Sequence, residues 1–513
     1  MKIRGFATLI AGMAMPMGVG HAAAPVAGAE AQTAAAIDRV IHLNPRINAV
    51  IALDPTALDQ ARALDRRGRK IGPLGGLPIL IKDNIETAGP VATTAGSLAL
   101  SANVTGRDAP LVARLRQAGG VILGKTNLSE WANIRSDTSI SGWSAVGGQT
   151  RNPFALSRSP CGSSSGSGAA VAAGMVTAAI GTETDGSITC PAAVNGIVGL
   201  KPTLGLVSRT HIVPISHSQD TAGPMARDVR TAAMLLSAIA GSDPADAATR
   251  DADAHKVDYA AALRPDALKN VRLGVLRWAT GWHAGVDTRF EAALVVLKAQ
   301  GAILVDISEA PDRRQIGEAE YKILMTELKS DLNAYLASTP GTVAARTLED
   351  VIAFNTTHAS KELALFGQAA FLTAQATKGP DDPDYQKARV TAQRLAGPEG
   401  LDKMLAGQNV AALIAPTAPP AWFIDPVNGD QAPFGGAGAL AAVAGYPHLT
   451  VPMGGVLGLP VGLSFIGPKW SEAKLLAYGY AFEQAAPEMQ LKPGLFQTIE
   501  DQPEVQKLLA PAR

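Results

Sequence analysis

Residues 161–191 read CGSSSGSGAAVAAGMVTAAIGTETDGSITCP, and this stretch decides the fold. Serine- and glycine-rich segments usually form flexible linkers or cap helices. A linker is excluded here because the serines run straight into small apolar residues with no polar tract between them. We therefore predict a helix over residues 165–179 that can be buried on every side. A strand should follow it and enter a turn that contains Gly186.

Alternating helix and strand patterns continue on both sides of this stretch. Residues 77–81 read as a buried strand between two turns, and Lys82 follows at once. Residues 109–127 read as a helix, a glycine stop and a short strand. A second run of this kind begins at VRLGVLRW (271–278), and late strands are predicted in VAALIAPTAP (410–419) and GLPVGLSFIG (458–467). This alternation predicts one large α/β domain.

Helical patterns are predicted in three further parts of the chain. Residues 33–69 have apolar residues at helical spacing, interrupted by NPRINAVIAL. Residues 379–400 are polar and proline-rich, which predicts the tip of a helical insertion spanning approximately residues 310–400. SEAKLLAYGYAFEQA (471–485) predicts a closing amphipathic helix.

The bulk composition limits the classes of partner. The 513 residues are 47% hydrophobic and 18% charged, which predicts a large buried interior. There are 45 basic and 45 acidic residues and no long run of either sign. Since nucleic-acid binding draws its affinity from clustered Lys and Arg, no nucleic-acid partner is expected.

The N-terminal residues have the layout of a secretory signal peptide. Lys2 and Arg4 precede an apolar stretch over residues 6–19, and GHAAAP supplies small residues for cleavage. The apolar stretch is short for a membrane anchor, so we expect no stable membrane association. Residues 1–23 are therefore predicted to be removed, and the mature protein is expected to be periplasmic or secreted.

Two cysteines flank the serine-rich stretch. Cys161 precedes Ser163 by two residues, and Cys190 follows Ser187 by three. We interpret them as two small buried hydrophobic side chains. The alternative is a single disulfide bond that pins two loops together, which an oxidising compartment would permit.

A nucleophilic serine needs a base, and Lys82 is the candidate. A buried lysine can lose its proton near neutral pH and act as a base. GSSSG also satisfies G-x-S-x-G around Ser164, but no buried strand precedes it, so that match is interpreted as accidental. No histidine has a motif context that marks it as a triad member; the eight are His21, His42, His211, His217, His255, His283, His358 and His448.

The serine-rich stretch and its surroundings resemble the amidase signature family. The resemblance extends to the motifs GLPILIKDNI, GKTNLSEWAN, GGQTRNPF, HSQDTAGPM and LPVGLSFIG, and so to most of the chain. It implies a single domain over residues 30–513, with a large mixed, twisted β-sheet flanked by helices on both faces. Within the family, TDGSITCP and SRSPCGSSSGSG are most similar to the motifs of members that hydrolyse C-terminal carboxamides of peptides.

The resemblance also implies a Ser–Ser–Lys triad. Lys82 corresponds to the family's lysine, Ser163 to the relay serine on a cis peptide, and Ser187 to the nucleophile. The spacing of 24 residues between the serines matches the family pattern, which selects Ser163 over its serine neighbours. Substrate and oxyanion contacts are then expected from Ser163 and from the backbone N–H groups of the loop that ends at Ser187, formed by Thr184, Asp185, Gly186 and Ser187.

The expected activity is hydrolysis of carboxamides to carboxylate and ammonia through an acyl-enzyme. The alternatives are an amidase of other small or fatty amides, and the amidase subunit of a tRNA-dependent amidotransferase. Two positions depart from the pattern of many members, which have glycine in place of Asp185 and arginine in place of Thr189; both departures disfavour small acidic substrates. No cofactor or metal is expected. The partner is a small-molecule or peptide amide, and the protein is expected to be a monomer or homodimer.

Overall fold

A mixed sheet of 11 strands forms the centre of the protein, in the order β1-β3-β2-β6-β8-β7-β12-β13-β11-β9-β10. The structure is a computed structural model that describes residues 28–68, 71–432 and 435–510. The sheet strands are β1 (Val50–Leu53), β2 (Pro78–Lys82), β3 (Val121–Thr126), β6 (Ala178–Glu183), β7 (Val198–Lys201), β8 (Thr221–Ala226), β9 (Arg272–Leu276), β10 (Ile303–Ile307), β11 (Ala412–Pro416), β12 (His448–Val456) and β13 (Leu459–Ile466). Strand β2 pairs in parallel with β3 and β6, and β9 with β10 and β11, whereas the remaining sheet pairs are antiparallel.

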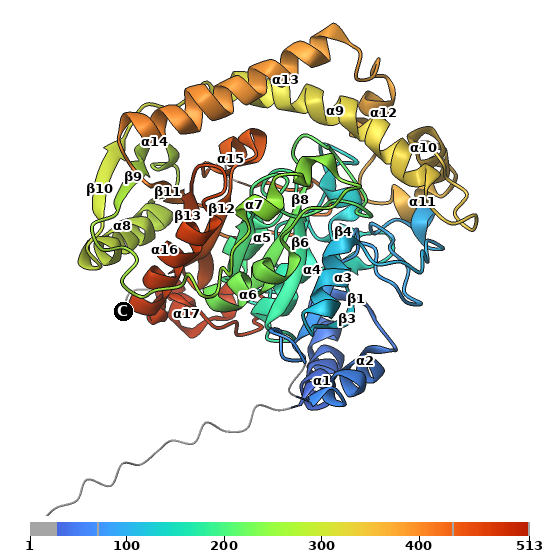
Figure 1. The fold of residues 1–513 in the computed structure, drawn as a ribbon, viewed down its shortest axis with the longest axis horizontal. Coiled ribbons are helices and arrows are strands. Elements are labelled where there is room, and N and C mark those ends of the chain that lie inside the picture. The colour runs from blue at the N-terminus through green and yellow to red at the C-terminus, as the bar shows by residue number, and fades with distance from the viewer. Residues whose placement is uncertain (1–27, 69–70, 433–434, 511–513) are drawn as a thin grey trace, which may run out of the picture.

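Helices cover both faces of the sheet (Figure 1). They are α1 (Ala29–Ile47), α2 (Ala57–Asp65), α3 (Pro110–Gln117), α4 (Ser165–Ala172), α5 (Thr189–Val194), α6 (Val229–Ile239), α7 (Ala252–His255), α8 (Ala284–Ala299), α9 (Arg313–Ala337), α10 (Leu348–Thr357), α11 (Ala359–Glu362), α12 (Ala369–Gln375), α13 (Pro383–Ala396), α14 (Lys403–Gly407), α15 (Gly438–Ala444), α16 (Glu472–Ala485) and α17 (Pro503–Leu509). Strands β4 (Trp143–Ser144) and β5 (Gly148–Gln149) form a separate two-stranded sheet. The predicted mixed α/β architecture is confirmed.

The alternation of side chains along β2 explains why two layers of helices are needed. Ile79 and Ile81 belong to the core that contains α3, α6, α8 and α16. Leu80, which points to the opposite face, belongs to the core that contains α1, α2, α4 and α5. An apolar strand of this kind is stable only when both of its faces are covered. Lys82, two residues after Leu80, is thereby directed toward the face on which α4 packs.

Helix α4 is shorter than the sequence suggested. All eight of its residues are buried, as expected from their small size, but the helix ends at Ala172 rather than continuing to residue 179. Gly174 adopts a φ of +75°, a left-handed conformation that terminates helices. The chain can therefore turn and enter β6 at Ala178, which brings the two ends of the serine-rich stretch close together.

Helices α9 to α14 occupy the chain between β10 and β11, and Figure 1 shows α9 and α13 as two long helices lying side by side. Most of residues 379–400, predicted as the tip of a helical insertion, are themselves helical, because α13 occupies Pro383–Ala396. Asp382 caps this helix and Pro383 begins it. Its buried positions recur at helical spacing among polar residues, and they are Tyr385, Ala388, Ala392 and Ala396.

The signal peptide predicted at residues 1–23 lies outside the described residues. Within the part of the chain that the structure describes, no helix combines the length and apolar character needed to cross a bilayer.

Candidate active site

Lys82 is the last residue of β2 and its side chain is completely buried. Its Nζ lies 2.7 Å from Oγ of Ser163, 2.8 Å from Oγ1 of Thr182 and 3.3 Å from the Thr182 carbonyl oxygen. Burial lowers the pKa of Lys82 to about 7, although the carboxylates of Asp220 and Glu183 oppose this shift. An amine at this position therefore exchanges its proton near neutral pH, as a general base must.

Ser163 lies in the tight turn before α4 and follows a cis peptide bond between Gly162 and Ser163. The Ser129 backbone N–H donates to the Ser163 carbonyl oxygen at 3.1 Å, and the Ser163 side chain is completely buried. A Cβ atom on Gly162 would lie 2.1 Å from Oγ of Ser129, so the turn needs glycine at this position. The backbone around Ser163 is thus fixed on both sides, which orients its hydroxyl toward Lys82.

The other serines of the stretch bond to the backbone. Ser164 Oγ donates to the Thr182 carbonyl at 3.0 Å, Ser165 Oγ to the Cys161 carbonyl at 2.6 Å, and Ser167 Oγ to the Ile180 carbonyl at 3.2 Å. Among these described serines, Ser163 alone contacts the lysine. Ser164, the centre of the G-x-S-x-G match, holds α4 against β6.

The loop that ends at Ser187 leaves β6 directly beside Ser163. The Ser164 N–H donates to the Ser187 carbonyl oxygen at 3.1 Å, which joins the two serine-bearing segments. Gly186 has a φ of +74°, which glycine adopts without strain. Within the described chain, no acceptor receives the backbone N–H groups of this loop, namely those of Thr184, Asp185, Gly186 and Ser187. Such free donors around a serine can bind a negatively charged oxygen.

The buried carboxylates of Glu183 and Asp220 hold this loop in place through hydrogen bonds. Glu183 Oε2 accepts from the backbone N–H groups of Ile188 at 2.8 Å and Thr189 at 2.9 Å, which anchors the start of α5. Asp220 Oδ1 accepts from Thr184 Oγ1 at 2.6 Å. Burial raises the pKa of Asp220 to about 6. The sequence reading assigned no role to either carboxylate, although Asp220 lies within the motif HSQDTAGPM.

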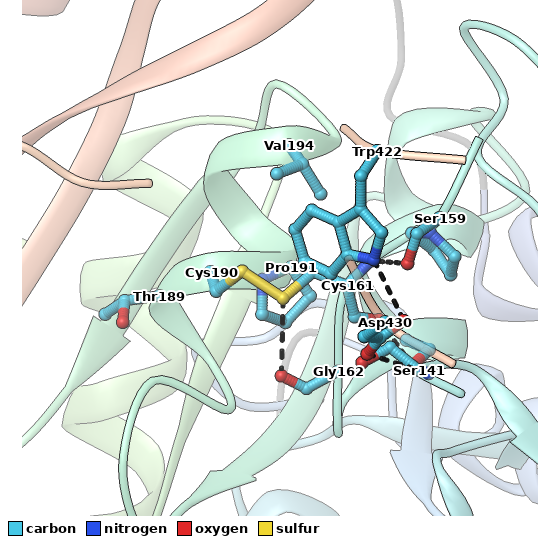
Figure 2. Close-up of a disulfide and its surroundings, with 12 residues drawn as sticks. Ser141, Ser159, Cys161, Gly162, Thr189, Cys190, Pro191, Val194, Trp422 and Asp430 are labelled. Atoms are coloured by element: carbon cyan, nitrogen blue, oxygen red, sulfur yellow. Dashed lines mark hydrogen bonds between the residues drawn. A yellow bond between two sulfur atoms is a disulfide. The ribbon is translucent and has the colours of Figure 1, made fainter. Parts of the chain in front are cut away.

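A disulfide bond between Cys161 and Cys190 joins the two segments a second time (Figure 2). The interpretation of these residues as unpaired hydrophobic side chains was therefore wrong. The sequence separates them by 29 residues, but the short α4 and the return along β6 bring their Cα atoms to 6.1 Å. One sulfur lies two residues before Ser163 and the other three residues after Ser187, so the bond ties together the turns that carry both serines.

Two cavities flank the loop 184–187. One of about 580 Å³ is bounded by Asp185, Gly186 and Thr189, by α9 and by Trp422. The other, of about 370 Å³, is bounded by Thr182, Thr184 and Asp220. A small organic amide can be accommodated in a cavity of this size beside Ser187.

The structure places the residues that the sequence analysis selected in one region, although among the described residues no hydrogen bond joins the Ser187 hydroxyl to Ser163 or Lys82. Ser163 contacts Lys82 directly, and the loop of Thr184, Asp185, Gly186 and Ser187 adjoins Ser163 through Ser164. No hydrogen bond joins Ser163 or Ser187 to a histidine among the described residues. The partners that the sequence reading missed are Asn84, Thr182, Glu183 and Asp220, and buried polar residues at strand ends were the available signal.

Comparison with known proteins agrees with this geometry. Residues 31–476 match the family model described as Amidase. The native peptide amidase from Stenotrophomonas maltophilia is 50% identical, with a TM-score of 0.86 over 91% of this chain and 96% of that one. A peptide amidase in complex with the competitive inhibitor chymostatin is 51% identical, with a TM-score of 0.87 over 91% of this chain and 96% of that one.

Relatives of other kinds are also similar along most of their length. A probable amidase from Arabidopsis thaliana is 39% identical over 88% of this chain and 85% of its own. A glutamyl-tRNA(Gln) amidotransferase subunit from Synechococcus is 36% identical over 90% of this chain and 89% of its own. The chain belongs to the amidase signature family. It is an amidase that hydrolyses C–N bonds, and its structure is close to that of peptide amidase.

Proposed function

We propose that the protein hydrolyses carboxamides, and C-terminal amides of peptides in particular, by a Ser–Ser–Lys mechanism. The observation that carries the proposal is the buried contact of 2.7 Å between Nζ of Lys82 and Oγ of Ser163, next to the loop of Ser187. A base with a pKa of about 7 is matched to proton transfer at neutral pH. The 50–51% identity to peptide amidases supports the choice of substrate.

In the first half of the reaction, neutral Lys82 takes the proton of Ser163, which takes the proton of Ser187. Oγ of Ser187 forms a bond to the amide carbon, and the carbonyl oxygen becomes an oxyanion facing the free N–H groups of residues 184–187. The lysine proton then returns through Ser163 to the amide nitrogen. The C–N bond breaks, ammonia leaves and an ester on Ser187 remains.

In the second half, a water molecule takes the place of ammonia. Lys82 removes a proton from this water through Ser163, and the hydroxyl attacks the ester carbon. The bond to Oγ of Ser187 breaks, the proton returns to Ser187, and the carboxylic acid is released. Each proton that Lys82 accepts is returned within the same half-reaction, so the enzyme ends in its starting state.

Replacement of Ser187 tests the mechanism. Ser187→Ala should lower the release of ammonia from a peptide amide by about 10³-fold or more while leaving the circular dichroism spectrum unchanged. The exposed Ser101 offers a matched control, and Ser101→Ala should keep full activity. Wild-type rates in Ser187→Ala would remove Ser187 from the role of nucleophile.

The similarity to amidotransferase subunits favours a second candidate function, in which the ammonia is passed to a partner protein. The two candidates are separated by assaying the purified chain alone. If the protein is a peptide amidase, it should release ammonia faster from peptide amides than from free glutamine or asparagine. It should also release ammonia faster from peptide amides than from short aliphatic or fatty amides. Glutamine as the best substrate would favour the amidotransferase role.

We also propose that the protein is exported to the periplasm or secreted. The signal-peptide layout of residues 1–23 supports this, and so does the disulfide bond, because such bonds persist in oxidising compartments. Cell fractionation should find the protein outside the cytoplasm, with an intact mass that corresponds to cleavage near Ala22 or Ala23. Full-length protein in the cytoplasm would contradict the proposal.

A further inference from the structure

The cavity of about 580 Å³ beside the loop 184–187 contains two carboxyl groups from distant parts of the chain. Asp185 lies on the loop itself, two residues before Ser187, and its side chain is exposed to the cavity. Glu320 comes from α9 and is 8% exposed. Both residues line the same cavity as Gly186 and Thr189, which stand on either side of Ser187 in the chain.

These carboxyl groups have acceptor oxygens that the protein leaves free. Among the described residues, no donor bonds to the Asp185 side chain. Oε1 of Glu320 accepts from Nε2 of Gln219 at 2.8 Å, whereas its Oε2 has no donor in the described chain although the side chain is more than nine-tenths buried. This oxygen is not among the fully enclosed atoms of the described chain, and Glu320 lines the cavity, so Oε2 is open to a hydrogen bond from a ligand.

Gln219 fixes Glu320 relative to the reacting loop. The same Nε2 that bonds Glu320 also donates to the Thr184 carbonyl oxygen at 3.3 Å. Helix α9 and the loop 184–187 are therefore coupled through one amide group. The position of Glu320 is set with respect to Ser187 and not only with respect to its own helix.

The charges around the cavity indicate which kind of ligand group can bind to these carboxyl groups. The pKa of Asp185 is raised well above its usual value, because the group is removed from bulk water and because the carboxyl groups of Glu320 and Glu183 lie near it. Burial raises the pKa of Glu320 as well. Lys201 lowers the pKa of Asp185, but its own Nζ is buried and donates to the Pro202 carbonyl at 3.2 Å. Arg313 and Arg314 of α9 also line this cavity, so it contains charges of both signs. Next to Asp185 and Glu320 themselves, a neutral N–H donor can bond to the carboxyl oxygens, whereas another carboxylate is repelled.

We propose that Asp185 and Glu320 form a subsite for an N–H donor on the carbon next to the scissile carboxamide. This inference rests on the proposed function and narrows its substrate class to amides of α-amino acids, as the last residue of a peptide amide or as a free amino-acid amide. The α-nitrogen of such a substrate lies two bonds, or less than about 3 Å, from the carbon that Ser187 attacks. The Cα atoms of Asp185 and Ser187 are at most about 7.6 Å apart, so the carboxyl group is within reach of that nitrogen.

The test compares amides that share a side chain but differ at the α-nitrogen. N-acetyl-phenylalaninamide and phenylalaninamide have the donor, and 3-phenylpropionamide lacks it. A site built around a hydrogen bond rejects the analogue that lacks it, by up to about 10⁴-fold in kcat/KM. The wild-type protein should therefore prefer the two α-amino acid amides by about 10²-fold or more.

Variants assign this preference to the two carboxyl groups. Asp185→Asn and Glu320→Gln should each reduce the preference ratio at least about tenfold, whatever happens to the absolute rates. Glu349→Gln is the matched control in the same inserted segment, because Glu349 is an exposed residue of α10 and does not line this cavity. This control should leave the ratio unchanged. The ratio is an internal comparison, so a partly unfolded variant still reports it.

Three outcomes overturn the inference. The first is a wild-type ratio near one while hydrolysis still depends on Ser187, which leaves the proposed function standing. The second is a high ratio that survives in both Asp185→Asn and Glu320→Gln. The third is hydrolysis of none of the three amides, which overturns the proposed function together with the subsite.

Discussion

Nζ of Lys82 lies 2.7 Å from Oγ of Ser163 in a region that water does not reach. The lysine comes from the end of a strand and the serine from the turn before α4, so the contact depends on the whole β2–α4–β6 arrangement. It is the shortest contact that Nζ makes. Proton exchange between these two atoms is therefore the step that pH and mutation should expose most directly.

The activity should depend on the protonation of Lys82. Because the ammonium form has no lone pair, kcat/KM should rise about tenfold per pH unit below the pKa and level off above it. With a pKa of about 7, the rise should end near neutral pH. Measurement of ammonia release across the pH range checks this. Lys82→Met should lose activity by about 10²–10⁴-fold, whereas the exposed Lys298→Met should behave as wild type. A flat profile through pH 7 would contradict the assignment.

Ser163 and Ser164 are neighbours with different partners, which gives a matched pair of variants. Ser163→Ala interrupts the proton path and should lower kcat by about 10²–10⁴-fold with little change in KM. Ser164→Ala removes a buried hydrogen bond to the Thr182 carbonyl and should lower the free energy of unfolding by about 1 kcal/mol. Steady-state kinetics and thermal unfolding separate the two effects. A larger loss of kcat in Ser164→Ala than in Ser163→Ala would reverse their roles.

Gly162 should not tolerate a side chain. In Gly162→Ala, the new Cβ atom would lie 2.1 Å from Oγ of Ser129, so the turn that carries Ser163 must shift. Overpacking of this kind costs about 1–3 kcal/mol of stability, and kcat should fall as Ser163 moves away from Lys82. Removal of the Ser129 hydroxyl in the double variant Ser129→Ala/Gly162→Ala should restore part of the lost activity. An unimpaired Gly162→Ala enzyme would show that the turn is less restricted than its contacts indicate.

Loss of the disulfide bond should destabilise both serine-bearing turns. For the 29-residue separation of Cys161 and Cys190, the chain-entropy relation gives a loss of about 3–4 kcal/mol on removal. Cys161→Ala/Cys190→Ala should therefore unfold at lower denaturant concentration and have a lower kcat. The intact mass of the wild-type protein should increase by two hydrogens on reduction. An unchanged mass, or a double variant as stable as wild type, would argue against the bond.

Local sequence patterns were sufficient to predict several strands, the closing helix and the position of Lys82. The apolar residues 77–81 predicted the strand that buries Lys82. The choice of Ser163 rather than Ser164 came from the resemblance to the amidase signature family, whose spacing of 24 residues the two serines match. The late strands and the closing helix were also predicted correctly. The strands were recognisable because they are short apolar runs bounded by Gly and Pro, and both of their faces are buried. The end of α4 was missed because Gly174 is small and apolar, like the helix residues around it.

The rest of the site depends on distances that no local pattern contains. The pairing of Cys161 with Cys190 requires α4 to be short and β6 to return along it. Glu320 belongs to a long helix whose sequence has ordinary polar and apolar residues, and nothing near it indicates a cavity. Buried Asp220 and Glu183 likewise acquire their roles only from the loop that folds over them.

Helix α9 contributes to the wall of the cavity but supplies none of the reacting groups proposed for the chemistry. The positions of α9 that face the cavity can therefore change while Lys82, Ser163 and Ser187 stay in place. Diversification of substrate preference within this scaffold is then expected to concentrate at these positions, where a mutation alters which acyl group enters without changing how the amide is opened.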